Sequence, residues 1–335
     1  MMLRRTGLLL AVLMLALSVG SLPAADIWAK GILHCHSTNS DGDVSPQEVA
    51  DWYKDHGYQF VVLTDHEKVT DVAPLDKDPN DKFILIPGEE LALNWRNLPI
   101  HANAIGLTKT LRSPGPLVTR GKSVANLVDY IRKTGAIPMV NHPSWYFALS
   151  HRELLQIEGP YLLEMANMGG DCFNEGDAAH LSLEQTWDIL LSEGRTVYAT
   201  ATDDAHHYKE FTPTNINPGR GWVVVRVADL TLAAVLDALG NGRFYASTGV
   251  ELAGYTFDGK TMKVKVVPKE GQTYRIRFVG KYGRILQETE GVSASYRVSG
   301  ARERNDYVRC KVICSDRTVA WTQPAYSLPS PVAGL

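Results

Sequence analysis

The sequence predicts an α/β fold: a barrel-like arrangement of about seven strands, followed by a small antiparallel β domain. Between residues 32 and 201, short β-branched or apolar runs alternate with helical patterns, as in parallel strands covered by helices. Polar side chains gather where these runs end. After residue 250 the helical patterns stop, and short alternating strands with glycine turns follow, which is typical of an antiparallel β-sandwich or sheet.

The predicted elements of the first domain follow one another in order. A strand at 32–35 precedes a helix that begins with the capping box Ser45-Pro46-Gln47-Glu48 and ends at Gly57. Helices at 123–133 and 182–193 are likewise followed by glycine, at Gly135 and Gly194. The further predicted strands cover residues 60–63, 83–86, 101–106, 137–141, 161–165 and 196–200.

An open doubly wound sheet is the alternative to a barrel. The sequence has no Gly-x-Gly-x-x-Gly turn and no Walker-type loop, so a nucleotide-cofactor sheet has little support. A strand at 222–227, a helix at 230–239 and the run 243–249 complete the first domain. Strands are then predicted at 262–267, 274–279, 296–298, 307–314 and 319–321. We therefore expect a signal peptide at 1–25, the barrel at 26–249 and the β domain at 250–335.

The first 25 residues have the layout of a secretory signal. Arg4-Arg5 precede an apolar run from Leu8 to Val19 and a segment rich in small residues. We expect export to the periplasm or the medium, with no stable membrane span after cleavage; an uncleaved anchor is the alternative. The spacing of the four cysteines, Cys35, Cys172, Cys310 and Cys314, builds no disulfide framework, and Cys310 and Cys314 are interpreted as small core residues.

The net charge of −3 provides no basic footprint for a nucleic-acid backbone. We therefore expect a small-molecule substrate and no nucleic-acid partner. The oligomeric state is not predicted.

Two histidines two positions apart organise the predicted site. His34 and His36 lie at the end of a predicted strand, where side chains two apart project to the same side. Neutral imidazole is a common zinc ligand, and Asp41 follows after a short polar turn. Because a lone His-x-His is also found in ordinary cores, the assignment depends on partners elsewhere.

Such partners stand at the ends of the other predicted strands. The carboxyl ends of strands share one face in parallel α/β barrels, so these side chains are expected to converge. Nine nitrogen and oxygen ligands without cysteine suit two or three divalent ions of a hydrolytic site. The predicted ligands are His34, His36, Asp41, His66, Glu90, His101, His142, Asp204 and His206.

Some of these choices have alternatives. Adjacent strand residues point to opposite sides, so only one of Asp203 and Asp204 should face the metals; Asp204 shares a face with His206. Asp65 and Asn141 are predicted to orient ligating imidazoles. His207 would either touch the substrate or face away. The remaining histidines, His56, His151 and His180, are interpreted as residues outside the metal site.

The ordered motifs resemble those of the polymerase and histidinol phosphatase (PHP) superfamily over roughly residues 30–207. They are His34-Cys35-His36, Ser40-Asp41-Gly42, Thr64-Asp65-His66, Pro87-Gly88-Glu89-Glu90, His101 with Ile105-Gly106-Leu107, Asn141-His142-Pro143 and Asp204-Ala205-His206. The resemblance implies a distorted seven-stranded (β/α) barrel that binds up to three zinc, manganese or iron ions. It also favours Glu90 over Glu89 as the ligand.

By motif position, His34 and His36 would bind a first ion with Glu90 and Asp204. Glu90 would bridge to a second ion held by His101 and His142. The third ion would be held by Asp41, His66 and His206. The signal peptide, the Asp-Ala-His-His run and the Phe-Tyr-Ala-Ser-Thr-Gly run at 244–249 resemble an exported branch that includes carbamate and aryl-ester hydrolases.

We therefore expect a metal-dependent hydrolase, in the first place a phosphoesterase that uses metal-activated hydroxide at a di- or trinuclear site. His206 or His207 would protonate the leaving group, and Asp65 would support the chemistry. A carbamate or carboxyl ester hydrolase is the alternative, followed by a non-catalytic metal-dependent binding protein. Arg96 and Arg120 are the candidates for binding phosphate. The expected pocket lining is Asn94, Trp95, Trp145, Tyr146 and Tyr208.

Overall fold

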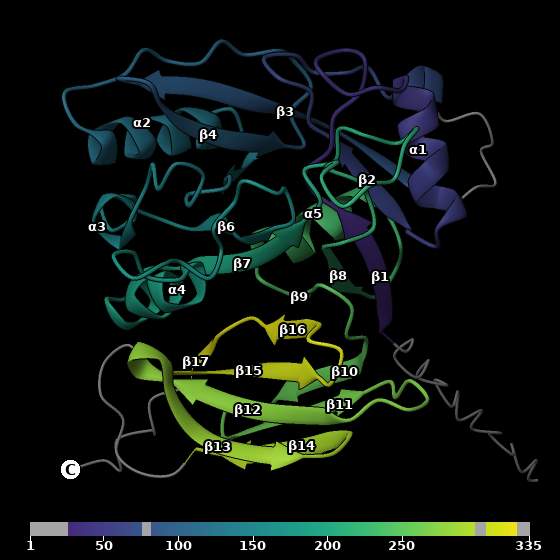
Figure 1. Cartoon of the computed structure of the whole chain (residues 1–335), viewed down its shortest axis with the longest axis vertical. Helices are drawn as coiled ribbons and strands as arrows, with labels where there is room; N and C mark the ends of the chain where they lie inside the picture. The colour runs from purple at the N-terminus through teal and green to yellow at the C-terminus, as the bar shows by residue number, and fades with distance from the viewer. Residues whose placement is uncertain (1–25, 76–81, 299–305, 327–335) are drawn as a thin grey trace, which may run out of the picture.

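In the computed structural model, residues 26–75, 82–298 and 306–326 are described. They form an α/β part above and a β part below (Figure 1). The predicted signal peptide, residues 1–25, lies outside the described residues. Within the described ranges, no helix is long and apolar enough to cross a membrane.

The strands of the α/β part lie side by side in chain order. The first three pair in parallel, and so do the last three. Beyond the carboxyl ends of the first and last strands, a parallel bridge joins Cys35 to Ala205. These strands are β1 (Ile27–Ile32), β2 (Phe60–Leu63), β3 (Ile84–Trp95), β4 (Leu98–Ile105), β5 (Ile137–Val140), β6 (Tyr161–Asn167) and β7 (Val197–Thr202). The predicted α/β class is confirmed; the strand count of a closed barrel stays a prediction.

The expectation of an entirely parallel sheet is wrong at β4. This strand is antiparallel to both β3 and β5. β3 continues past the predicted end to Trp95 and turns through Arg96 and Asn97, whose φ angles are 50° and 67°. Positive φ at both central residues is what a tight hairpin turn requires. His101 therefore lies within β4, opposite Ala92 of β3.

Among the described residues, five helices accompany these strands, and each begins after a serine or threonine cap. Ser45 and Glu48 form the predicted capping box, and Ser182 with Gln185 forms another. The apolar side of the second helix, including Leu127 and Ile131, is buried in the core. The helices are α1 (Pro46–Asp55), α2 (Arg120–Arg132), α3 (His151–Leu154), α4 (Leu183–Ser192) and α5 (Leu232–Gly240), with short 3₁₀ turns η1 (Ala73–Leu75) and η2 (Lys281–Gly283).

The sheet extends from β1 into the C-terminal part. β8 (Trp222–Val227) pairs with β1, and β9 (Phe244–Ser247) connects β8 to β16 (Val319–Thr322). Beyond β16 lie β15 (Tyr307–Cys314), β12 (Tyr274–Gly280) and β13 (Arg284–Glu290), and β17 (Ala325–Tyr326) pairs with β15. The pairing of β16 with β9 crosses the predicted domain boundary at residue 249, which stays a prediction.

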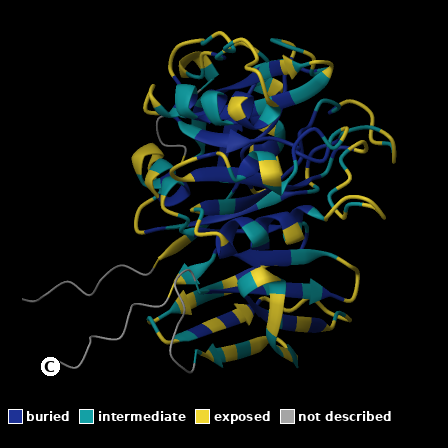
Figure 2. Cartoon of the chain, turned by 90° about the vertical axis from the view of Figure 1, so that its left-hand side faces the viewer, coloured by how far each residue is buried: buried dark blue, intermediate teal, exposed yellow. Residues whose placement is uncertain are grey.

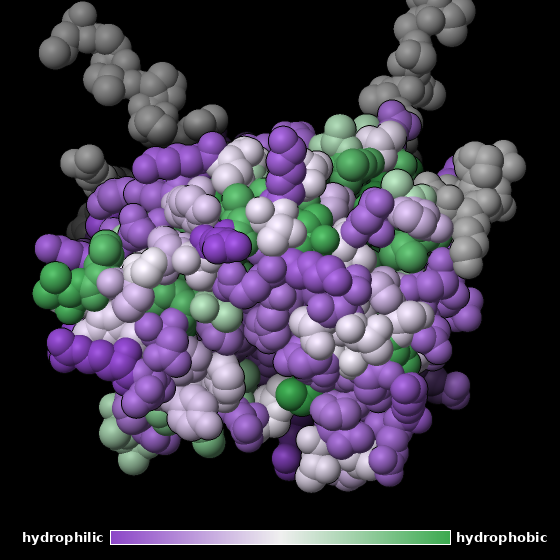
Figure 3. Space-filling model, turned by 90° about the horizontal axis from the view of Figure 1, so that it is seen from above, coloured by the Kyte–Doolittle hydropathy of each residue, from purple (hydrophilic) through white to green (hydrophobic). Residues whose placement is uncertain are grey.

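A second sheet completes the C-terminal part. It contains β10 (Leu252–Phe257), β11 (Thr261–Val266) and β14 (Ser293–Arg297). Its central strand β11 alternates buried and exposed residues, and strands in the lower part of Figure 2 show the same change of colour. Met262 and Val264 of β11 join Ile276 and Phe278 in a shared apolar core. β10 and β13 were not among the predicted strands. From above, the molecule presents a mainly hydrophilic surface with separate apolar patches (Figure 3).

Candidate metal centre

The predicted ligands converge in a pocket of about 210 Å³ at the carboxyl ends of the strands. Loops after β1, β2, β5 and β7 bring one set of side chains, and the β3–β4 hairpin brings Glu90 and His101. Of the predicted ligands, those that line the pocket are Asp41, His66, Glu90, His101, His142, Asp204 and His206. His34 and His36 lie fully buried beneath it.

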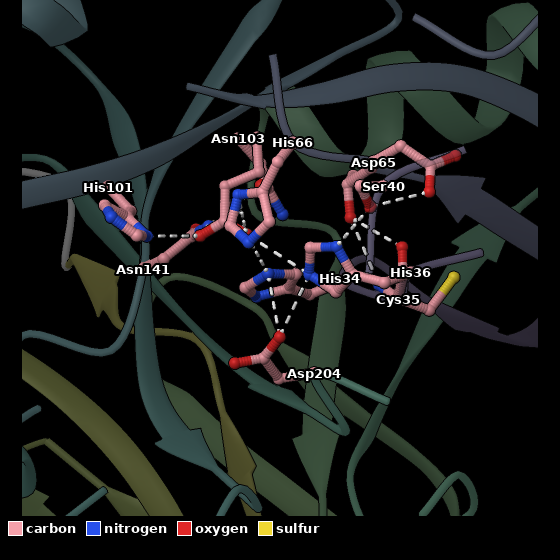
Figure 4. Close-up of polar contacts among 12 residues, drawn as sticks. His34, Cys35, His36, Ser40, Asp65, His66, His101, Asn103, Asn141 and Asp204 are labelled. Carbon is pink, nitrogen blue, oxygen red and sulfur yellow. Dashed lines mark hydrogen bonds and ion pairs between the residues drawn. The ribbon is translucent and has the colours of Figure 1, made fainter. Parts of the chain in front are cut away.

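One buried group consists of His34, His36, Glu90 and Asp204, whose potential ligand atoms all lie within 4.8 Å of one another. His34 Nε2 is 3.0 Å from Glu90 Oε2 and 3.1 Å from Asp204 Oδ1. His36 Nε2 is 3.1 Å from the same Asp204 oxygen. Figure 4 shows the two imidazoles and Asp204 converging, while Cys35 points away. As expected for His-x-His, the side chains of His34 and His36 project to one side and that of Cys35 to the other.

A second group is more open to solvent and contains His36, Asp41, His66 and His206. Asp41 Oδ1 lies 3.5 Å from His36 Nδ1 and 3.4 Å from His206 Nε2. Asp41 Oδ2 lies 3.6 Å from His66 Nε2. His36 therefore stands between the two groups, with one ring nitrogen toward each.

The third group is formed by His66, Glu90 and His101. Glu90 Oε1 is 3.1 Å from His101 Nδ1 and also 3.1 Å from His142 Nε2. Glu90 Oε2 is 3.3 Å from His66 Nδ1. Because its two oxygens face histidines of different groups, Glu90 has the position of a bridging carboxylate.

The structure distinguishes the members of the two acidic pairs. Asp203 points away from the pocket and accepts the backbone N–H groups of Gly219 and Gly221, each at 2.8 Å. Glu89 likewise points away and accepts the N–H of Leu111 at 2.9 Å. Asp204 faces the histidines with φ of 52°, a left-handed conformation that costs free energy in a non-glycine residue.

Glu164 is a candidate site residue that the sequence analysis missed. It is fully buried on β6, and its Oε1 lies 2.7 Å from Nδ1 of His34. Its Oε2 accepts the backbone N–H of His142 at 2.6 Å and the amide of Asn167 at 2.8 Å. Asn167 also donates to Asp204 Oδ2 at 3.0 Å. The available signal was one acidic residue inside an otherwise apolar strand.

Asp65 lies beside His36, next to Ser40 (Figure 4), and supports the loop after His36. Its carboxylate accepts the N–H and hydroxyl of Ser37, at 2.8 and 2.9 Å, and the hydroxyls of Ser40 and Thr70. Ser40 Oγ is 3.3 Å from His36 Nδ1. Asp65 therefore acts on the imidazole of His36 through Ser40. Among the described hydrogen bonds, none joins Asp65 directly to an imidazole ring.

Asn141 contacts a carboxylate where an imidazole contact was expected. Its amide donates to Glu90 Oε1 and to Asn103 Oδ1, both at 2.8 Å. Asn103 in turn donates to the carbonyl of Leu33 at 3.0 Å. Asn141 thus helps to set the orientation of Glu90.

The structure separates the two histidines considered as acids. His206 lines the pocket, and its Nδ1 donates to the carbonyl of Asp204 at 2.6 Å, which leaves Nε2 facing Asp41. His207 is not among the residues that line the pocket in the described ranges. Its Nδ1 accepts the N–H of Ile216 at 3.3 Å.

Of the five residues expected in the lining, only Trp145 belongs to it among the described residues. Its ring packs edge-on against His101 and His142, with centroid separations of 5.6 and 5.1 Å. Tyr208 is buried and packs edge-on against Tyr53. Asn94, Trp95 and Tyr146 are outside the lining.

The two arginines proposed for phosphate are placed elsewhere. Arg120 pairs with Glu153 at 3.0 Å, and Arg96 lies over the ring of Trp95. Consequently no Lys or Arg lines the pocket within the described part of the chain. The histidines set aside earlier also lie outside it: His56 stacks on Trp52, and His180 pairs with Asp177.

The charges in the cluster strongly favour a cation. Burial alone would lower the pKa of His34, but Asp204, Glu90 and Glu164 raise it well above its ordinary value. Burial opposes the same change at His36, yet hydrogen bonds to Asp204 and Glu90 raise its pKa to about 9. Burial would raise the pKa of Glu90, but the surrounding histidines hold it well below its usual range. Asp203 accepts backbone N–H groups that lower its pKa, but burial outweighs them and raises the pKa to about 6.

The donor set fits divalent metal ions. Imidazole nitrogens and carboxylate oxygens are the ligands of zinc, manganese and non-haem iron in hydrolytic sites. Nδ1 of His66 is buried, lies 3.3 Å from Glu90 Oε2 and makes no hydrogen bond within the described residues, so its lone pair is available to a cation shared with that carboxylate. The first group would hold one ion, Glu90 would connect it to a second, and the group around Asp41 would hold a third.

Comparisons with known proteins give similarities of limited extent. No family model matches the sequence. The chain is 32% identical over 182 residues to a 5'-3' exoribonuclease from Haemophilus influenzae, a match that covers 50% of this chain. The chain spans 64% of the length of that relative.

Two solved structures are similar at low identity. One is a two-domain protein containing a predicted PHP-like metal-dependent phosphoesterase from Bacteroides vulgatus, with 18% identity and a TM-score of 0.46; the match covers 90% of this chain and 96% of that one. The other is an amidohydrolase from Chromobacterium violaceum with bound sulfate and no metal. It has 14% identity, a TM-score of 0.38, and coverage of 56% of this chain and 93% of that one.

Proposed function

We propose that this chain is an exported metal-dependent hydrolase of the PHP superfamily that cleaves phosphate esters. The observation that carries the proposal is the overlap of three His/carboxylate groups in one pocket, linked through His36, His66 and Glu90. The exoribonuclease similarity supports phosphorus as the electrophile, since such an enzyme cleaves phosphodiester bonds. The proposal of export rests on the signal-like residues 1–25.

In this proposal the side chains have two roles: most would hold the metal ions, and one would transfer a proton. When bound, divalent ions would polarise the ester and lower the pKa of a water ligand. Glu164 and Asn167 fix His34 and Asp204, and Asn141 fixes Glu90. Where the third position holds no ion, Nε2 of His206 is free to protonate the leaving oxygen.

A carboxyl or carbamate ester is the second candidate substrate. The observation in its favour is the absence of Lys and Arg from the pocket lining in the described ranges. A neutral ester needs no cationic side chain, whereas a phosphate would depend on the metal ions alone for its charge. The metal chemistry would be the same for both electrophiles.

The test combines metal analysis with turnover of three p-nitrophenyl compounds: the phosphate, the bis-phosphate and the acetate. We expect the purified mature protein to hold two or three divalent ions per chain and to hydrolyse a phosphate ester. His34→Ala should lose both properties, while His56→Ala, which changes a histidine that stacks on Trp52, should keep them.

Metal-dependent turnover of the acetate alone would move the assignment to the second candidate. A protein that binds no ions and cleaves none of the three compounds would overturn both assignments.

A further inference from the structure

A groove of about 650 Å³ is lined by the second sheet of the C-terminal part. All three strands of that sheet, β10, β11 and β14, contribute residues to it, and they lie in the lower part of the molecule in Figure 1. Asp26 and Trp28, at the start of β1, also line the groove. The predicted metal ligand His34 follows the other end of β1, about 20 Å further along an extended chain. The groove is therefore separate from the metal pocket.

The side of this sheet that faces away from the core carries positive charge. Met262 and Val264 of β11 are buried, so Lys263 and Lys265 project to the opposite side, where both are exposed. The strand register places further polar side chains of β10 and β14 on the same outward face. Its members are Thr256, Thr261, Lys263, Lys265, Ser293, Ser295 and Arg297. This set contains three cations, four hydroxyl groups and no acidic or apolar side chain.

The groove itself has an excess of cationic side chains. Arg226, Lys263 and Lys265 line it, and the acidic residue in its described lining is Asp26, which lies 3.7 Å from Arg226. Neither lysine forms an ion pair with another side chain of the described ranges. The two lysines stand about 7 Å apart along the strand, because residues two apart share one face. A partner with negative charges repeated along its length would complement this row.

The composition of the outward face favours a chain of acidic sugars over a membrane or a nucleic acid. Proteins that bind a bilayer surface insert apolar side chains, and this face has none. Single-stranded nucleic acids stack their bases on free aromatic rings. The ring of Trp28, however, already packs against Tyr245 and Tyr255, with both centroid separations at 5.7 Å. Serine and threonine hydroxyls can both donate to and accept from sugar hydroxyls, and lysine pairs with carboxylates.

We propose that this groove binds an acidic polysaccharide, a chain of uronate sugars whose carboxylates pair with Lys263 and Lys265 and whose hydroxyls contact Ser293 and Ser295. The inference goes beyond the proposed hydrolase function and does not depend on it. It gives the C-terminal part the role of attaching the protein to a polymer. The metal pocket, which lies beyond the other end of β1, stays uncovered.

Fluorescence anisotropy of a labelled hexagalacturonate, titrated with the purified protein, tests the inference. We expect saturable binding that weakens as the salt concentration rises, because salt screens exposed charges. Lys263→Ala/Lys265→Ala should weaken binding about ten-fold, the scale of two exposed ion pairs. Lys263→Arg/Lys265→Arg keeps both charges and should keep the affinity. The matched control is Lys122→Ala/Lys133→Ala, which removes the same charge from exposed positions in and after α2 and should bind like the wild type.

Comparison ligands identify the class of partner. They are labelled maltohexaose, which has no charge, a phosphorothioate hexauridylate, which resists hydrolysis, and vesicles of phosphatidylglycerol. All three should bind more weakly than hexagalacturonate. Equal or tighter binding of any of them, absence of saturable binding to hexagalacturonate, unchanged binding in Lys263→Ala/Lys265→Ala, or an equal loss in the α2 control would overturn the inference. Because the variants lie outside the metal pocket and the readout is binding, such a failure is distinct from a failure of the metal and turnover tests.

Discussion

A carboxylate behind His34 determines how that imidazole can serve as a ligand. Glu164 accepts a hydrogen bond from Nδ1 of His34, at 2.7 Å, so Nε2 is the nitrogen that faces Glu90 and Asp204 and can bind an ion. Carboxylates in this position fix the tautomer of a ligating histidine and raise its basicity. Glu164 therefore contributes to metal affinity as a positioning residue.

Glu164→Gln should reduce metal affinity about 10- to 100-fold, because the amide keeps the size of the side chain and removes its charge. Competition with a chelating dye measures the change. Glu158→Gln is the control, since Glu158 pairs only at the surface, with Arg195. Equal affinities of the wild type and Glu164→Gln would contradict the assigned role.

Lys30, which is outside the lining of the metal pocket, makes the free energy of unfolding depend on pH. Its ammonium lies over the rings of Tyr58 and Trp222, 3.8 and 4.0 Å from their centroids. Burial lowers its pKa from 10.5 to about 8, although Asp203 and Glu251 oppose the change. Between these two pH values the unfolded chain holds a proton that the folded protein has released, so raising the pH favours the folded state.

The free energy of unfolding of the wild type, relative to Lys30→Met, should therefore rise as the pH rises from about 8 to about 10.5. Urea denaturation at intervals across this range measures the difference, and contributions from other groups cancel between the two proteins. A difference that stays constant or falls with pH would exclude a lowered pKa at Lys30.

Single helices and strands with strong local sequence signals could be predicted, whereas the pairing between strands could not. α1 follows its capping box and β2 its apolar run, and both lie where the sequence places them. The β3–β4 hairpin was missed because an apolar run does not reveal the direction of its partner strand. β10 and β13 were missed because neither has a clear apolar alternation: β10 has one buried residue and a register shift at Gly254, and β13 has none that is buried.

The same distinction applies to the site. Eight of the nine predicted ligands were chosen from histidine and carboxylate spacing near the predicted strand ends, which is a local feature, and the family resemblance decided between Glu89 and Glu90. Glu164 and Asn167 lie within a buried strand, and their importance depends on contacts with His34 and Asp204, 130 and 37 residues away. Such contacts become visible only in three dimensions.

The loop after β1 depends on one buried carboxylate, so Asp65→Asn should weaken both folding and metal binding. The amide would lose charge-assisted bonds from Ser37, Ser40 and Thr70, at a cost of about 1–3 kcal/mol. Urea denaturation measures the stability, and metal titration measures the ligand set around His36. Asp71→Asn, an exposed neighbour, serves as the control; unaltered metal binding by Asp65→Asn would show that the loop holds its shape without this charge.

Across the whole molecule, a buried ion pair joins the C-terminal part to α4. Arg309 on β15 is 1% exposed, and its guanidinium contacts Asp188 at 2.7 and 2.8 Å. The hydroxyl of Tyr307 donates to the same carboxylate at 2.7 Å. Asp188 therefore has partners that come from the other part of the molecule.

Arg309→Met should lower the free energy of unfolding by about 3–5 kcal/mol, because it leaves Asp188 buried without its cation. The double variant Arg309→Met/Asp188→Leu should recover much of this loss, since no unpaired charge remains. Chemical denaturation of both variants measures the effect. If the double variant were as unstable as the single one, the loss would come from packing and not from the unpaired charge.

The bridge between Cys35 and Ala205 also constrains the order in which the molecule matures. His36 and Asp204, which meet at 3.1 Å, are 168 positions apart in the chain. During synthesis the amino-terminal half of this contact emerges from the ribosome long before its partner exists. Contacts between such distant segments form slowly, because a long loop must close first. A nascent chain therefore holds His34 and His36 before Asp204 has been made, and the assembled cluster marks a chain in which the loop after β1 has met the loop after β7.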